Sequence, residues 1–405
     1  MNLSELLLLA FKGLVVASIP LAAVWTARGE DRLRRLAWVT AFFTFDLIVF
    51  GGFTRLTDAG LGCPDWPGCY EKANPLLAAH DIHAAEALMP AGPVTMTKAW
   101  IEMVHRYLAM GVGILIIVLV AWSWLRLRRR ARASLRLATA ALLLVCLQGA
   151  FGAWTVTMKL QPAIVTTHLL LGMSLLAMLV WHALRLDASP ERSLSPSSAT
   201  ACGRQLRTLA IAGGILLAIQ IALGAWVSTN YAVLACNDFP LCQGKWVPAM
   251  DFTNGFHLWR ALGKTGDGAN LSLAALTAIH WAHRSFSVIV FPVLAALAWR
   301  AATTRELKRP ALLLLLLLAA QFATGLVNVV FAWPLAAAVL HNAGAAGLVA
   351  VLVVINYRVR RAAQVLRPAN ADPARSSNPR IAAPRATAEV QSLDSSHTPS
   401  HATGS

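Results

Sequence analysis

Residues 310–332 read PALLLLLLLAAQFATGLVNVVFA and contain no charged side chain. A helix of about 20 such residues crosses the hydrocarbon core of a bilayer. Comparable runs recur along the chain, and together they predict nine membrane-spanning helices, at about 4–26, 36–56, 99–124, 136–157, 162–184, 207–229, 274–299, 310–332 and 335–357. The expected fold is therefore an all-α polytopic membrane protein.

The composition agrees with this fold class. Hydrophobic residues make up 57% of the chain and charged residues 13%, whereas soluble domains average about 45–50% and about 25%. These values exclude an ordinary soluble enzyme, a disordered protein and a small disulfide-rich secreted protein. The net charge of +16 does not indicate a nucleic-acid partner, because most Lys and Arg flank the spans, where basic residues set membrane topology.

The basic residues also predict the orientation of the chain. Most of them lie in one alternating set of connections, around residues 28–35, 126–136, 185–207, 300–309 and 358–367. These connections are expected to lie on the cytoplasmic side of a bacterial inner membrane. The N-terminus and the long loops 57–98 and 230–273 are then periplasmic, and the C-terminus is cytoplasmic. Because Glu5 and no basic residue precede the first apolar run, we interpret that run as a retained span rather than a signal peptide.

Two similar halves follow one another in the sequence. Matching residues lie 173 positions apart: Cys63 and Cys236, Cys69 and Cys242, Gly51 and Gly224, Gln148 and Gln321, Gly152 and Gly325, and His168 and His341. Each half has four spans, so both halves have the same orientation. This predicts two four-helix bundles related by a pseudo-twofold along the membrane normal.

The predicted organisation has five parts. They are an extra N-terminal transmembrane helix (1–30), an N-terminal bundle (36–185), a cytoplasmic linker (186–206), a C-terminal bundle (207–357) and a disordered cytoplasmic tail (358–405). We expect the repeated glycines to permit close helix packing and the repeated glutamines to make interhelical hydrogen bonds.

The repeated cysteines lie in the two long periplasmic loops. Each pair encloses five residues, and the periplasm is oxidising. We therefore predict two disulfides, Cys63–Cys69 and Cys236–Cys242. The alternative, a pair of metal-binding motifs, lacks a matching set of further ligands in the loops.

Four histidines lie near the outer ends of their spans, one pair in each half: His105 and His168, then His283 and His341. Ionisable residues inside a membrane are costly and are functional candidates by default. Two imidazoles that face each other across a bundle can hold a haem iron by both axial positions. A metal-transport path is the main alternative, but the sequence has almost none of the intramembrane carboxylates that such a path needs.

The two halves differ beside these histidines. Glu102 lies one helical turn before His105, on the same face, whereas His280 occupies the corresponding place before His283. A carboxylate beside a haem can act as acid, base or orienter, or it can merely fix the imidazole by a hydrogen bond. The difference favours chemistry in the N-terminal half and a permanent cofactor in the C-terminal half. It also leaves His280 as a competitor of His283 for the role of ligand.

Three arginines are expected at the outer helix ends: Arg55, Arg106 and Arg284. They are candidates for ion pairs with haem propionates. The alternative is that they extend toward the membrane interface without binding a ligand.

Five segments of the chain resemble haem A synthase: GGFTRLTDAGLGCPDWPGC (51–69), EMVHR (102–106), TTH (166–168), HR (283–284) and LHNAG (340–344). The extra N-terminal span, the long first loop and His280 depart from that family. The resemblance implies an inner-membrane oxidoreductase that converts haem O to haem A. It oxidises the C8 methyl group to a formyl group by successive hydroxylations, and the product supplies cytochrome c oxidase.

The resemblance also implies roles for the site residues. His105 and His168 hold the substrate haem O, with Glu102 as the catalytic carboxylate, and His283 and His341 hold a haem b. The implied partners are membrane lipid, a haem O synthase upstream and cytochrome c oxidase assembly downstream. The sequence does not decide whether the chain forms a homo-oligomer. A di-haem b electron-transfer cytochrome of the quinol-oxidising type and a haem or metal transporter are the alternatives. The first gives Glu102 no special task, and the second predicts binding without oxidation of the porphyrin.

Overall fold

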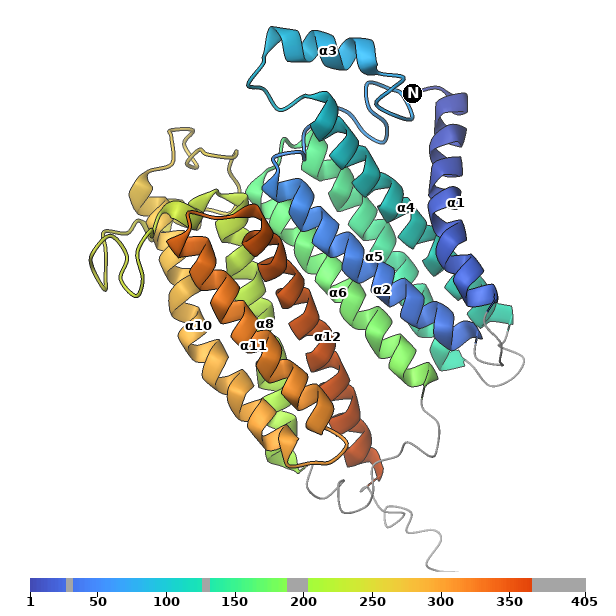
Figure 1. Ribbon diagram of the computed structural model, residues 1–405, viewed down its shortest axis with the longest axis vertical. Coiled ribbons are helices and arrows are strands. Elements are labelled where there is room, and N and C mark those ends of the chain that lie inside the picture. Colours follow the sequence, from blue (N-terminus) through green and yellow to red (C-terminus); the bar gives the residue numbers. More distant parts are fainter. Residues whose placement is uncertain (27–31, 126–131, 188–202, 366–405) are drawn as a thin grey trace, which may run out of the picture. The chain divides into compact units, whose positions relative to one another are not determined.

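The computed structural model describes residues 1–26, 32–125, 132–187 and 203–365. Within these ranges it contains nine helices that are long and apolar enough to cross a membrane, and it contains no strand. They belong to one compact unit, Met1–Leu366, shown in Figure 1. The prediction of an all-α polytopic membrane protein with nine spans is confirmed for the described part of the chain.

The long helices agree with the predicted spans to within a few residues, except at some ends. They are α1 (Leu3–Trp25), α2 (Arg32–Leu56), α4 (Met96–Leu125), α5 (Arg132–Thr157), α6 (Pro162–Leu186), α8 (Arg204–Thr229), α10 (Leu273–Ala302), α11 (Lys308–Val330) and α12 (Leu335–Val365). Three short helices, which the hydropathy pattern did not predict, lie in the two long loops: α3 (Ala79–Leu88), η3 (Ala232–Leu234) and α9 (Phe252–Gly255).

The spans pack in two similar sets. In the first set α2 packs against α4 and α6, and α5 packs against α4 and α6. In the second set α10 packs against α8 and α11, and α12 packs against α8 and α11. The sets meet where α12 contacts α2 and α6 and where α6 contacts α8, and buried apolar residues of both sets form one continuous core. This packing supports the predicted pair of bundles, whose exact bounds stay a prediction.

Residues at equivalent positions of the two halves touch each other. Arg55 Nη2 donates to the backbone oxygen of Ser228 at 2.7 Å, and the hydroxyl of Tyr231 donates to Asp58 Oδ1 at 2.7 Å. The partners in both bonds are 173 positions apart, which is the spacing of the sequence repeat. A twofold relation brings a position close to its own repeat only near the axis, so these contacts support the predicted pseudo-twofold.

The last helix is longer than expected. α12 continues to Val365, so residues 358–365, which we assigned to a disordered tail, are helical. The basic residues Arg358, Arg360 and Arg361 lie in this part. Their positive charges interact favourably with the negative, C-terminal end of the helix macrodipole. Arg358 also donates to the backbone oxygen of Glu306 at 2.6 Å. Most of the predicted linker (188–202) and the rest of the predicted tail (366–405) lie outside the described residues.

Candidate functional site

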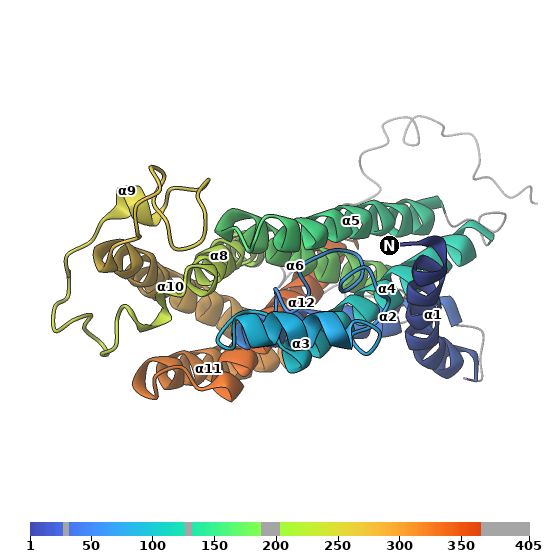
Figure 2. The ribbon, with the colours of Figure 1, turned by 90° about the horizontal axis from the view of Figure 1, so that it is seen from above.

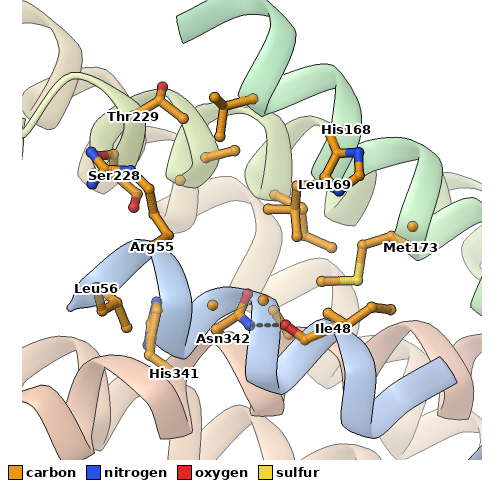
Figure 3. A pocket seen from close by; sticks show the side chains of 18 of the residues that line it. Ile48, Arg55, Leu56, His168, Leu169, Met173, Ser228, Thr229, His341 and Asn342 are labelled. Carbon is orange, nitrogen blue, oxygen red and sulfur yellow. Dashed lines mark hydrogen bonds between the residues drawn. The ribbon is translucent and has the colours of Figure 1, made fainter. Parts of the chain in front are cut away.

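A large cavity of about 1270 Å³ lies among the spans. All four repeated histidines line it, together with Glu102 and many apolar side chains and glycines. Pockets for one small ligand usually measure about 300–1,000 Å³, so this cavity exceeds what one such ligand needs. Figure 3 shows part of it, with His168 on one side, His341 on the other and Arg55 and Asn342 between them.

The histidines are arranged as the predicted pairs. His105 on α4 and His168 on α6 lie within electrostatic reach of each other, and so do His283 on α10 and His341 on α12. Among the described residues no group of three or more His, Cys, Asp or Glu converges as it would around a metal ion. The paired imidazoles therefore suit a group that takes two protein ligands, such as a haem iron.

Each imidazole lies against one of the repeated glycines. A β-carbon built on Gly51 would lie 2.9 Å from His105 Nε2, and one built on Gly224 would lie 2.9 Å from His283 Cε1. At Gly152 and Gly325 the distances to Cε1 of His168 and His341 would be 3.3 and 3.4 Å. These glycines make room for the histidine rings, a more specific role than the close helix packing that we expected from the sequence.

Glutamine side chains fix the helices that carry three of the histidines. Gln148 and Gln321 donate to the backbone oxygens of His168 and His341, at 2.9 and 2.8 Å. Gln220 does the same for His283, at 3.1 Å. The sequence repeat predicted the first two interhelical bonds. It could not reveal Gln220, because Leu47 stands at the matching position of the first half.

The second histidine pair has partners for its ring nitrogens. Thr324 Oγ1 lies 2.9 Å from Nδ1 of His341, and Gln220 Nε2 lies 3.2 Å from Nδ1 of His283. Nδ1 of His168, by contrast, is buried and has no hydrogen-bond partner, and the contact of that ring is at Nε2, which lies 3.5 Å from Gln148 Nε2. Contacts to the second ring nitrogen orient a metal-ligating histidine. Both rings of the second pair have such a contact at Nδ1, whereas the contact of His168 with Gln148 is at Nε2 and is longer.

Glu102 and His280 perform the same structural task in the two halves. Oε2 of the buried Glu102 accepts the backbone N–H of Cys63 at 2.8 Å, and Nδ1 of His280 accepts the backbone N–H of Cys236 at 3.3 Å. Each side chain therefore fastens the first cysteine of its loop, while each also lines the cavity. His280 is committed to its loop, whereas His283 faces the other histidine of its pair, which favours His283 as the ligand.

Two of the candidate arginines hold the cysteine loops. Arg106 donates to the backbone oxygens of Asp65, at 2.9 Å, Pro67 and Gly68, and it forms a buried ion pair with Glu102. Arg284 donates to the backbone oxygens of Asp238, Pro240 and Leu241, at 2.9, 3.2 and 3.0 Å. This anchoring was not foreseen from the sequence. Both side chains also line the cavity, so their contact with propionates stays a prediction.

Arg55 has a different set of partners. It forms an ion pair with Asp58 at 3.2 Å, and its guanidinium lies 4.0 Å from the centre of the Tyr231 ring. With its bond to the Ser228 oxygen, it links the two halves at the wall of the cavity. Its predicted contact with a propionate likewise stays a prediction.

The two cysteine loops have matching structures. Cys63 pairs with Cys69 and Cys236 with Cys242, at S–S distances of 2.07 and 1.99 Å, which confirms the predicted disulfides. In each loop an aspartate caps the turn: Asp65 accepts the N–H groups of Tyr70 and Glu71, and Asp238 accepts those of Gln243 and Gly244. The bond from Gly244 is the main reason that the pKa of Asp238 lies below its usual range.

The chain is similar to known proteins of one family. The model of a family described as cytochrome oxidase assembly protein, COX15-CtaA, matches residues 34–353. The heme A synthase of Shewanella oneidensis is 39% identical over 326 residues, which cover 80% of this chain and 96% of that protein. The heme A synthase of Caulobacter sp. (strain K31) is 31% identical over 363 residues, with 82% and 98% covered. That of Sphingopyxis alaskensis is 30% identical over 348 residues, with 81% and 92% covered.

Proposed function

Since this chain belongs to the cytochrome oxidase assembly protein family COX15-CtaA, we propose that it works as its relatives are named, as a heme A synthase. It is a membrane enzyme that converts haem O to haem A by an oxidative reaction. Haem O is the substrate and haem A the product, which supplies cytochrome c oxidase. In the finer proposal, the C8 methyl group becomes a formyl group by successive hydroxylations.

The first histidine pair is proposed to bind the substrate haem O, through His105 and His168. The supporting observations are that both rings line the cavity and that Nδ1 of the buried His168 has no hydrogen-bond partner among the described residues. The second pair, His283 and His341, is proposed to hold a haem b that supplies electron-transfer chemistry when it is bound. Thr324 and Gln220 support this assignment, because their contacts orient the two rings in advance.

Glu102 is the proposed catalytic carboxylate, and it carries the proposal because it is the main chemical difference between two otherwise matched sites. The bond from Cys63 N–H and the ion pair with Arg106 fix its position in the cavity wall. A fixed carboxylate can accept and return a proton during oxidation of a nearby methyl group. His280 takes its place in the second half, where no turnover is expected.

The location and partners follow from the same proposal. We place the chain in a bacterial inner membrane, with the N-terminus and both cysteine loops in the periplasm and the C-terminus in the cytoplasm, on the distribution of basic residues. A haem O synthase is the expected supplier of the substrate, and assembly of cytochrome c oxidase uses the product. Membrane lipid is expected to surround the spans. A second copy of the chain is a further candidate partner, which a measurement of the oligomeric state would test.

The test is to extract the haems of the purified protein after co-expression with a source of haem O. The wild-type protein should yield haem A and a hydroxylated intermediate, whereas Glu102→Gln should accumulate haem O. The matched variant His280→Gln alters the same position of the other half and should still yield haem A. Recovery of haem b alone, at two per chain in all three proteins, would support a di-haem electron-transfer cytochrome instead.

A further inference from the structure

The first helix, α1, lies outside the sequence repeat and outside the residues that the family model matches. It packs closely against α4: a β-carbon on Gly13 would lie 2.9 Å from Met110 Cβ, and one on Gly111 would lie 2.7 Å from Val16 Cγ1. Figures 1 and 2 show α1 beside α4, with the N-terminus at the end of the bundle that carries the first cysteine loop. α1 is therefore a fixed neighbour of that loop.

A polar side chain of α1 reaches the loop at Ala73. Glu5 Oε2 accepts the N–H of Ala73 at 2.7 Å, and the hydroxyl of Tyr107 donates to the oxygen of Ala73 at 2.6 Å. Lys12 supports Tyr107, because its Nζ lies 3.5 Å from the hydroxyl and 5.1 Å from the ring centre. Both backbone groups of Ala73 are thus held, one by α1 directly and one through a residue that α1 contacts.

Ala73 is coupled to the first disulfide through one tight turn. Cys69 and Lys72 exchange two backbone hydrogen bonds, of 2.9 and 3.0 Å, and Ala73 follows them directly. Ala73 and both cysteines belong to a buried apolar cluster that also contains Leu9 of α1 and Tyr107. Movement of Ala73 would therefore open the shell around the Cys63–Cys69 bond.

The second loop provides a natural comparison. It has the same disulfide and the same turn, in which Cys242 and Lys245 exchange two backbone bonds. At the position of Ala73 it has Trp246, which is 71% exposed and whose backbone oxygen accepts a bond from Trp281 Nε1 at 3.0 Å, and at the position of Tyr107 it has Ser285. Among the described residues no helix corresponding to α1 packs there. All four cysteines are buried, so each disulfide is accessible to an external thiol only when its loop moves, and the two loops differ in the contacts that hold them.

We propose that α1 is a positioning helix for the first cysteine loop, in which Glu5 and Lys12 hold Ala73 so that the Cys63–Cys69 disulfide is protected from external thiols. The same contacts keep the N–H of Cys63 in place on Glu102. Glu5 and Lys12 act through the loop, and neither residue lines the cavity. The proposal concerns the loop alone and stands independently of which haem the cavity binds.

The test measures how fast each disulfide is reduced in the full-length protein in detergent. Dithiothreitol is added, and the free cysteines of each loop are alkylated and quantified by peptide mass spectrometry over time. In the wild type, Cys236–Cys242 should be reduced faster than Cys63–Cys69. Glu5→Ala should accelerate reduction of Cys63–Cys69 by about tenfold, as expected for loss of a hydrogen bond to a charged group, and Lys12→Met by about threefold. Neither should change the rate for Cys236–Cys242.

Two control variants separate positioning from general loosening. Glu5→Gln keeps an acceptor oxygen for the N–H of Ala73 and should restore slow reduction. Ser18 lies on the exposed face of α1, where its hydroxyl donates to the backbone oxygen of Val15 in the same helix. In the Ser18→Ala protein the Cys63–Cys69 disulfide should be reduced at the wild-type rate. Equal rates for the two wild-type disulfides, no effect of Glu5→Ala and Lys12→Met, or equal acceleration of both disulfides would each overturn the proposal. A Glu5→Gln protein that is reduced as fast as Glu5→Ala would also overturn it.

Discussion

Gly51 lies directly against His105, so closely that a β-carbon at position 51 would be 2.9 Å from the Nε2 atom of that ring. The two residues come from neighbouring helices, α2 and α4, which pack together. The His105 ring therefore occupies the space that a side chain at position 51 would need. This relationship gives a direct way to disturb a proposed ligand without changing it.

Gly51→Ala should weaken haem binding at the first pair by at least about tenfold. Alanine normally stabilises a helix interior by about 1 kcal/mol relative to glycine, so a loss must arise from displacement of His105. Titration of the purified protein with haem, followed by absorbance, measures the effect. Gly214→Ala is the matched control, because a β-carbon there meets nothing within 4 Å, and its affinity should equal that of the wild type. An unchanged affinity of Gly51→Ala would contradict the assignment of His105.

The two glycines beside the second histidine pair should differ in how well they tolerate replacement by alanine. A β-carbon at Gly224 would lie 2.9 Å from the His283 ring, whereas one at Gly325 would lie 3.4 Å from the His341 ring, which is ordinary contact. We therefore expect Gly224→Ala to lose haem from the purified protein and Gly325→Ala to keep it. The haem content per chain, measured as the pyridine haemochrome, decides the matter. The reverse order would show that His283 is not held as described, and would favour His280 as the ligand.

Thr324→Val should lower haem affinity at the second pair by about 10- to 100-fold, the usual cost of removing the partner of a ligating histidine. The substitution preserves volume but removes the hydroxyl that contacts Nδ1 of His341. It should also shift the midpoint potential of the bound haem, which a spectroelectrochemical titration measures. Thr208→Val is the control, because Thr208 is exposed and bonds only to the backbone of its own helix. Equal potentials in the two variants would exclude an orienting role for Thr324.

Arg106→Lys should destabilise the protein more than Arg284→Lys. Arg106 serves three loop carbonyls and the buried carboxylate of Glu102, and the compact ammonium of lysine cannot reach all of these acceptors. Breaking a buried ion pair costs about 3–5 kcal/mol, whereas Arg284 donates to backbone oxygens and has the carboxylate of Asp238 only within longer electrostatic range. Thermal unfolding of both variants gives the comparison. If the melting temperature fell equally in both, Glu102 would not depend on Arg106 for its position.

Part of this molecule could be predicted because it repeats. The spans follow from hydropathy, and the histidine and cysteine pairs follow from a constant spacing, so each half supports the interpretation of the other. Gln220 and Thr324 escaped notice because Leu47 and Phe151 stand at their repeat positions, and a pattern based on symmetry cannot reveal a feature of one half. The loop-anchoring role of Arg106 was missed because its partners in the loop are backbone oxygens, which leave no trace in the residue types.

The contacts of Arg55 with Ser228 and of Asp58 with Tyr231 bear on how such a chain can arise. In a homodimer of one half, each of these positions would face its own copy, and arginine would meet arginine, a repulsive pairing of like charges. Fusion into one gene removes that constraint, because each side can then change alone. The same freedom allows a carboxylate at position 102 and an imidazole at position 280. Duplication followed by fusion thus provides a route from two identical sites to two sites with different chemistry.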